Sequence, residues 1–228
     1  ILIQGLKIMQ DNKNISKSVI RRLPRYYRFL GELLKEGVEK ISSRELSERM
    51  RLTASQIRQD LNCFGGFGQQ GYGYNVAELR EQIGAILHLN DMRTVILIGA
   101  GNLGRAVAVH IDFERYGCHL VGIFDRDDTL TGERISGIRI RAMDEIRVFC
   151  CEEHPAMAIL CIPRSGAEDV VKTLIGCGVR AFWNFSHYDI NADYPDAAVE
   201  NVHLTDSLMT LSYLMEEKDE PEDDTVTN

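Results

Sequence analysis

The sequence lacks the features that define several other classes of protein. No apolar run is long enough to cross a bilayer, and the first residues lack a basic and apolar secretory leader, so we expect no membrane partner. No C-x-x-C pair is present, and no Cys or His residues have the spacing of a zinc site, so we predict no metal. The cysteines therefore indicate reduced thiols in the cytoplasm. They are Cys63, Cys118, Cys150, Cys151, Cys161 and Cys177.

Positive charge is scarce in the second part of the chain but not in the first. Residues 9–80 hold 13 Lys or Arg against 8 Asp or Glu, whereas residues 81–228 hold 12 against 26. This asymmetry predicts that the first part contacts a polyanion. Residues 217–228 are acidic and nearly free of apolar side chains, so we expect a disordered tail there.

The first part has the pattern of a winged helix-turn-helix. Pro24 fits the first position of a helix whose apolar residues recur at helical spacing up to Gly37. Ser42 to Glu45 and Thr53 to Gln56 each match a capping box, which predicts two short helices. A further start at Asn75 predicts a connecting helix, and we place the domain boundary near residue 90.

The second short helix predicts a surface for reading DNA. Ser55, Arg58, Gln59 and Asn62 form one polar stripe, and Arg58 has the chemistry to contact guanine. A solvated helix face is the plainer interpretation of such a stripe. The glycine-rich segment that follows predicts a hairpin wing with Gln69 and Gln70 at its tip.

Basic side chains near the start add charge for the phosphate backbone. They are Lys17, Arg21, Arg22, Arg25 and Arg28.

The second part carries a complete dinucleotide-binding pattern. An apolar strand at 95–98 leads into glycines 99, 101 and 104, a helix through His110, and a strand that ends at Asp125. Gly101 admits a pyrophosphate to the backbone, and Asp125 accepts hydrogen bonds from the adenosine ribose, which favours NAD over NADP. Neighbouring Arg126 weakens that preference.

Alternating helices and strands continue the pattern to residue 204. We expect helices at 144–151 and 167–177, and strands at 158–162, 179–185 and 199–204. The predicted fold class is α/β, with a winged helix at 13–89, a parallel Rossmann-like sheet at 90–204 and a C-terminal helix at 205–216 capped by Thr205.

The sequence contains few candidate catalytic residues that could oxidise or reduce a bound dinucleotide. It has no Y-x-x-x-K pair, and its histidines are isolated. We therefore predict a sensor and no enzyme. Two alternatives remain open, a small NAD-dependent oxidoreductase and a ligand-binding protein whose winged helix contacts only other proteins.

The two patterns together resemble the Rex family of redox-sensing transcriptional repressors. The resemblance covers residues 13–215 and rests on the winged-helix segment, on GAGNLG and on the later FD, NFS and ENVHL. It implies a homodimer with a swapped C-terminal helix, bound to palindromic double-stranded operators when NAD+ dominates and released by NADH. The stripe Leu208, Leu211, Leu214 and Met215 fits such a swap.

The resemblance extends the predicted sites. To the dinucleotide site it adds Ala100, Asn102, Leu103, Ile162, Pro163, Phe185, His110, His203 and Leu204, and to the DNA site it adds Gln56 and Tyr72.

Several residues depart from the family pattern. Gln59, Gln69 and Gln70 stand where basic residues are usual, which predicts weaker phosphate contacts. His110 and His203 stand where Tyr and Asp couple the nicotinamide to domain rotation, and Arg164 replaces a small residue. We hypothesise altered discrimination between NADH and NAD+, with a pH response should the two imidazoles meet across the dimer.

Overall fold

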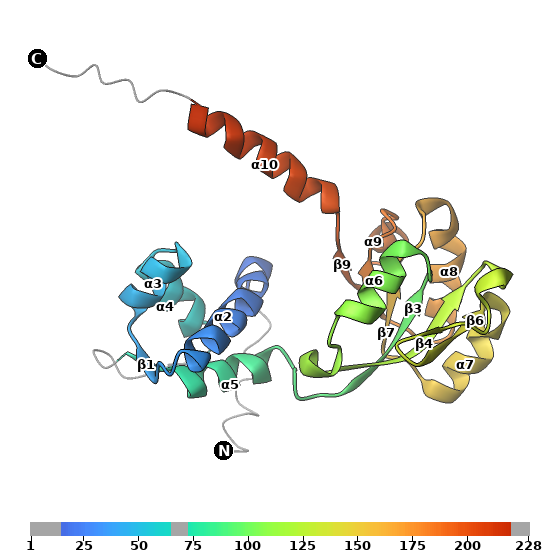
Figure 1. The fold of residues 1–228 in the computed structure, drawn as a ribbon, viewed down its shortest axis with the longest axis horizontal. Helices are drawn as coiled ribbons and strands as arrows, with labels where there is room; N and C mark the ends of the chain where they lie inside the picture. Colours follow the sequence, from blue (N-terminus) through green and yellow to red (C-terminus); the bar gives the residue numbers. More distant parts are fainter. Residues whose placement is uncertain (1–14, 65–72, 220–228) are drawn as a thin grey trace, which may run out of the picture. The chain divides into compact units, whose positions relative to one another are not determined.

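A computed structural model of the chain describes residues 15–64 and 73–219, with side chains up to Met215. Contacts divide the chain between Asp91 and Met92 into two compact units, which we call the N-terminal and C-terminal units (Figure 1).

The N-terminal unit is a small helical domain with a two-stranded sheet. Its elements are α2 (Lys17–Lys35), β1 (Lys40–Ile41), α3 (Ser43–Met50), α4 (Ala54–Asn62), β2 (Tyr74–Asn75) and α5 (Val76–Ile86). Helix α2 packs along α5, α3 packs against α4, and all four helices contribute to one apolar core.

Helix α2 begins earlier than the sequence pattern predicts. Ser16 is its N-cap and accepts a hydrogen bond from the Val19 amide, so Pro24 lies inside the helix and the prediction that it opens the helix is wrong. A proline there removes one backbone hydrogen bond. Because Val19 and Leu23 are buried on the core face before Pro24, packing outweighs that loss.

The caps of α3 and α4 differ from each other. Ser42 and Glu45 form the predicted reciprocal capping box. Thr53 accepts a hydrogen bond from the Gln56 amide, but the Gln56 side chain donates to Asp60 at 2.7 Å and not to the Thr53 backbone. The second predicted box is therefore only half formed, because the buried Asp60 carboxylate competes for the Gln56 amide.

Strands β1 and β2 mark the base of the predicted wing. They pair antiparallel, with Lys40 opposite Asn75 and Ile41 opposite Tyr74. The predicted wing tip, Gln69 and Gln70, and Tyr72 lie outside the described residues.

The C-terminal unit contains a seven-stranded sheet of order β5-β6-β4-β3-β7-β8-β9, parallel except for β5. The strands are β3 (Arg93–Ile98), β4 (Cys118–Asp125), β5 (Arg134–Ile135), β6 (Ile138–Ala142), β7 (Met157–Leu160), β8 (Ala181–Asn184) and β9 (Ala198–Asn201). The helices are α6 (Asn102–His110), α7 (Ile146–Glu153), α8 (Arg164–Gly176), α9 (Ile190–Asp193) and α10 (Leu204–Asp219), with 3-10 turns at Glu114–Tyr116, Asp128–Leu130 and Met143–Glu145.

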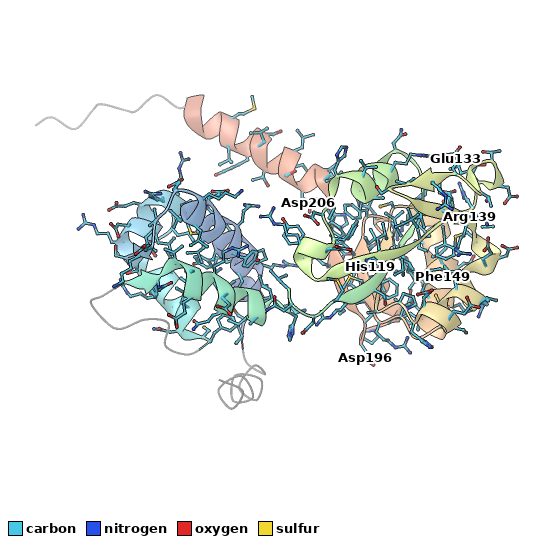
Figure 2. All side chains as sticks on the ribbon, turned by 60° about the horizontal axis from the view of Figure 1, so that its bottom comes forward. His119, Glu133, Arg139, Phe149, Asp196 and Asp206 are labelled. Atoms are coloured by element: carbon cyan, nitrogen blue, oxygen red, sulfur yellow. The ribbon has the colours of Figure 1, made fainter. Side chains whose placement is uncertain are left out.

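Alternate residues of β3 supply two separate cores. Ile96 and Ile98 face a cluster that includes α7, α8 and α9, whereas Val95 and Leu97 face a cluster that includes α6 and β5. In the first cluster Phe149, labelled in Figure 2, packs edge-on against Phe124 at a centroid distance of 5.2 Å. Burial of both faces explains the nearly continuous apolar sequence of the central strands.

The last helix differs from the prediction at both ends. α10 begins at Leu204, so Thr205 lies inside the helix and Leu204 does not end a strand. It continues to Asp219, so residues 217–219 are helical and not part of a disordered tail; residues 220–228 lie outside the described part. The hairpin of β5 and β6 was not predicted from the sequence.

Candidate functional site

The carboxyl end of β3 forms a turn that only glycines can make. Gly99 has φ of 99°, and a Cβ there would lie 2.4 Å from the Cys161 carbonyl oxygen. A Cβ on Gly104 would lie 1.8 Å from the Gly99 carbonyl oxygen, so α6 passes against the turn with no room for a side chain.

Gly101 differs from these two glycines because a Cβ there would meet no protein atom within 4 Å. It is the N-cap of α6 and supplies no side-chain cap, and the first two helical residues, Asn102 and Leu103, are exposed. The amides of this first turn therefore point to open space, and together with the helix dipole they favour a phosphate group.

Asp125 braces the turn at the end of β4. Its Oδ2 accepts a hydrogen bond from the buried Ala100 amide at 2.5 Å, and its Oδ1 accepts one from the Asp127 amide at 2.9 Å. Each carboxylate oxygen has a second lone pair, so these contacts leave Asp125 able to accept from a ribose hydroxyl. Arg126 is exposed beside it.

Most of the other predicted dinucleotide residues lie at the same edge of the sheet. Ile162 approaches Gly99 closely, Pro163 is the N-cap of α8, and Phe185 follows β8. Leu204 and His203 follow β9. Because the carboxyl ends of parallel strands share one edge, the predicted residues line one side of the unit.

His110 does not lie at this edge. It ends α6, roughly 12 Å along the helix axis from Asn102. His203 instead contacts His187 of the same chain, with their Nδ1 atoms 2.6 Å apart. The structure of one chain thus gives no pairing of His110 with His203, and the contact of His203 with His187 was missed from the sequence.

The thiol of Cys161, near the turn, is unreactive at neutral pH. Burial raises the pKa of Cys161 to about 12, so the group remains a protonated thiol at neutral pH. Cys161 is therefore a poor nucleophile.

In the N-terminal unit, α4 exposes the predicted polar stripe. Ser55, Arg58, Gln59 and Asn62 are exposed, while Ile57 and Leu61 are buried on the opposite face. Arg58 donates to Ser43 at 3.1 Å, which places its guanidinium beside the start of α3.

The inner face of α4 holds a charged residue that the sequence interpretation missed. Asp60 is fully buried and accepts hydrogen bonds from Arg22 at 2.6 and 2.7 Å, from Tyr26 at 2.9 Å and from Gln56 at 2.7 Å. Its place beside Ile57 and Leu61 on the apolar face was the available signal, because a buried carboxylate requires partners.

This network sets the ionisation of its members. Burial alone raises the pKa of Asp60, but hydrogen bonds from Arg22, Tyr26 and Gln56 hold it below its ordinary value. Burial and the Asp60 carboxylate raise the pKa of Tyr26.

The network also changes the predicted roles of two residues. Arg22 of α2 binds Asp60 of α4 and so fixes α4 against α2, while Gln56 binds Asp60 within α4. Both side chains are engaged with a buried carboxylate, which the sequence interpretation did not anticipate. Lys17, Arg21 and Arg28 are exposed on α2. Arg25 is exposed as well and donates to the Met50 carbonyl at the end of α3.

A helix-turn-helix unit followed by a sheet with a glycine-built phosphate turn defines the class of two-domain, dinucleotide-binding transcription regulators. Comparison with known proteins agrees with this class. A family model described as "Putative DNA-binding protein N-terminus" matches residues 14–62, and one described as "CoA binding domain" matches residues 90–188.

The chain belongs to the Rex family of redox-sensing transcriptional repressors. It is 50% identical to the redox-sensing transcriptional repressor Rex of Clostridium novyi over 91% of this chain and 98% of that protein. The Rex of Caldanaerobacter subterraneus is also 50% identical, over 92% of this chain and 94% of that protein.

Similar solved structures also belong to a Rex-family repressor. The structure of RSP with NAD+ and operator DNA is 48% identical with a TM-score of 0.83, and it covers 91% of this chain and 95% of its own. The structure of RSP with NADH is 46% identical, with the same TM-score, and it covers 91% and 97% respectively. No helix within residues 15–64 and 73–219 is long and apolar enough to span a membrane.

Proposed function

We propose that this chain is a transcriptional repressor that senses the ratio of NADH to NAD+, binds palindromic double-stranded operator DNA, and is released from it by NADH. The observation that carries the proposal is the presence, in one chain, of an exposed polar stripe on α4 and a glycine turn whose Gly101 faces open space that a phosphate can fill. Relatives solved with NAD+ and operator DNA, and with NADH, support both halves.

The DNA contacts follow from exposure. Ser55, Arg58 and Gln59 on α4 contact base edges, while Lys17, Arg21 and Arg28 on α2 neutralise phosphates. Arg22 and Gln56 support α4 without contacting DNA, because both side chains donate hydrogen bonds to the buried Asp60 carboxylate.

The dinucleotide lies along the carboxyl edge of the sheet. Its pyrophosphate binds the first turn of α6 at Gly101, Asn102 and Leu103, and its adenosine ribose binds Asp125. The nicotinamide then reaches the segments at Ile162, Pro163 and Phe185, close to His203 and Leu204.

A homodimer with exchanged C-terminal helices accounts for exposed apolar surface. Large side chains project into solvent around α10 (Figure 2), with Leu208 and Met209 63% and Leu214 47% exposed. Trp183 and Phe185, whose rings are tilted by 59° with centroids 5.0 Å apart, are only half-buried on one face of β8 and its following turn. A partner's α10 on such surface buries both sets of side chains.

The chain acts as a binding protein without turnover. The Cys161 thiol beside the turn is protonated at neutral pH, and the relatives are regulators. A repressor has to reach chromosomal DNA, so we place the chain in the cytoplasm. Absorbance of NADH at 340 nm, followed with candidate carbonyl substrates, tests this. A steady decrease in absorbance whose rate rises with the concentration of the protein contradicts the proposal.

We further propose that discrimination between NADH and NAD+ differs from that of the family, because His110, His203 and Arg164 replace the usual residues. Calorimetric titration with both nucleotides, with operator affinity measured beside it, tests the two statements separately. Similar affinities for both nucleotides are expected. Strong preference for NADH with release of DNA keeps the repressor function and contradicts altered discrimination.

Operator binding itself has a direct test. A mobility shift on a palindromic DNA fragment is expected to show a salt-dependent complex. Absence of any complex, at low salt and in the presence of NAD+, contradicts the DNA-binding function and favours a winged helix that contacts proteins.

A further inference from the structure

Two histidines converge at the carboxyl ends of the last two strands of the sheet. His187 lies in the turn between β8 and α9, and His203 lies between β9 and α10. Their Nδ1 atoms are 2.6 Å apart, their ring centroids are 4.6 Å apart, and their ring planes are inclined by 28°.

The turn that carries His187 is held by a buried amide. Asn184 is 1% exposed; its amide nitrogen donates to the Tyr188 carbonyl and to Asn201 Oδ1, and its Oδ1 accepts from the Ser186 amide and hydroxyl. The Asn184 carbonyl accepts from the Val202 amide at 2.9 Å, which ties the two segments together. The His pair therefore rests on a fixed scaffold.

His187 also has a strained backbone. Its φ is 60°, in the left-handed region that residues with a Cβ seldom adopt. Strain of this kind persists where the surroundings hold a residue in place, and it is frequent at functional sites. Here it directs an imidazole toward His203.

The two Nδ1 atoms form a hydrogen bond when one ring carries its proton on Nδ1 and the lone pair of the other ring accepts it. A neutral imidazole has one N–H and one lone pair, so two rings that both carry the proton on Nε2 would oppose their Nδ1 lone pairs. Either a shared proton or a metal cation removes that repulsion. Imidazole nitrogens suit divalent transition metals of borderline softness, such as zinc and nickel.

We propose that His187 and His203 form a binding site for a divalent transition-metal cation of this class. His203 also lies close to the place proposed for the nicotinamide, whereas His187 belongs to neither the nucleotide site nor the DNA site. The cation would link the β8–α9 turn to the residue that directly precedes α10.

The geometry needs only a small opening of the pair. With zinc–nitrogen distances of about 2.0–2.1 Å and tetrahedral angles, two imidazole nitrogens lie about 3.3 Å apart. His187 is exposed and His203 half-buried, so both rings have room to separate by the roughly 0.7 Å required beyond their present contact.

The remaining coordination positions are open within one chain. Among the described residues no group of three His, Cys, Asp or Glu side chains is placed to hold a metal, so water or a second copy completes the shell. The acidic residues within three positions of the two histidines are Asp189, Glu200 and Asp206, and the Asp206 amide donates to the His203 carbonyl. None of them belongs to the proposed ligand set.

Calorimetric titration of zinc chloride into the full chain, after removal of metals by chelator, tests the proposal. We expect one zinc per chain, and at least tenfold weaker binding in His187→Gln and in His203→Gln. His119→Gln is the matched control, because His119 is an exposed histidine paired with Glu114 elsewhere in the unit; it is expected to bind zinc as the parent does.

A second measurement needs no variant and so does not depend on folding. Diethyl pyrocarbonate labels accessible imidazoles, and peptide mass spectrometry should show that zinc protects His187 and His203 but not His119. The proposal is overturned when the parent chain binds no zinc, when the His187→Gln/His203→Gln double variant keeps the parent affinity, as a cysteine site would, or when zinc protects neither histidine.

Discussion

The two units present their binding surfaces by opposite means. In the N-terminal unit a buried carboxylate with four hydrogen bonds fixes the helix that exposes the polar stripe. In the C-terminal unit the absence of side chains at Gly99, Gly101 and Gly104 shapes the turn, and the surrounding core is apolar. One surface is thus sensitive to the loss of a charge, and the other to the gain of a single methyl group.

The largest effect on stability is expected when the cation that pairs with Asp60 is removed. Arg22→Leu leaves a fully buried carboxylate without its bidentate partner. Allowing for the partial exposure of Arg22, we expect the N-terminal unit to lose about 2 kcal/mol of unfolding free energy. Denaturant unfolding followed by circular dichroism measures this, and NADH affinity should not change.

Tyr26→Phe is the matched control for that variant. It removes one hydrogen bond to Asp60 and leaves the ion pair intact, so we expect a loss of about 1 kcal/mol. An Arg22→Leu variant as stable as the parent, or one that loses NADH affinity to the same degree as operator affinity, contradicts the separation of the two units.

A methyl group at Gly104 should act on the other unit alone. The clash with the Gly99 carbonyl forces α6 away from the turn, and we expect NADH affinity to fall by about 100-fold, on the order of 2.7 kcal/mol. Calorimetry measures the affinity. Gly176→Ala, where a Cβ meets nothing within 4 Å, should bind NADH as the parent does.

Gly101→Ala separates an effect on nucleotide binding from an effect on folding of the C-terminal unit. A Cβ at position 101 meets no protein atom, so the melting temperature should not change. The methyl group would enter the space in which we propose that the pyrophosphate binds. We expect a loss of affinity of roughly tenfold, about 1.4 kcal/mol. Unchanged affinity for NADH shows that the phosphate does not bind the first turn of α6.

The Asp60 network also predicts a pH response confined to the N-terminal unit. The pKa of Asp60 is lowered in the fold, so its contribution to stability is present above the unfolded value of about 3.9 and is lost as pH falls through the lower folded value. Unfolding free energy should therefore decline at acidic pH. Asp60→Asn should flatten this decline, and an equally steep decline in that variant contradicts the assignment.

The smallest effect is expected at Lys17, an exposed residue that we propose contacts a phosphate. Lys17→Gln should reduce the slope of log affinity against log salt by about 0.9 and weaken operator and unrelated DNA equally. Fluorescence anisotropy over a salt series measures the slope. Lys172→Gln, on the exposed side of α8, is the control and should not change it.

The sequence predicted those parts of the fold whose signals are local. The capping box at Ser42 and the strand, glycine turn and helix around Gly101 involve neighbours in the chain, and all were found. The prediction that Pro24 begins a helix was wrong because buried side chains on both sides of Pro24 stabilise a longer helix. The prediction of a full capping box at Gln56 was wrong because the Gln56 side chain donates to the buried Asp60 instead.

Contacts between distant residues were beyond the sequence. Arg22 and Asp60 are 38 residues apart, and His187 and His203 are 16 apart, so no spacing rule connects either pair. The hairpin of β5 and β6 was missed because its strands are short and rich in arginine. That residues 65–72 form a wing stays a prediction.

In the proposed function the bound nucleotide changes the affinity of the protein for operator DNA. Operator affinity measured by anisotropy, at one salt concentration and across the full range of NADH to NAD+ ratios, tests it most directly. The account predicts tight binding with NAD+ that weakens as the proportion of NADH rises. Equal affinity with NAD+, with NADH and without nucleotide would contradict it.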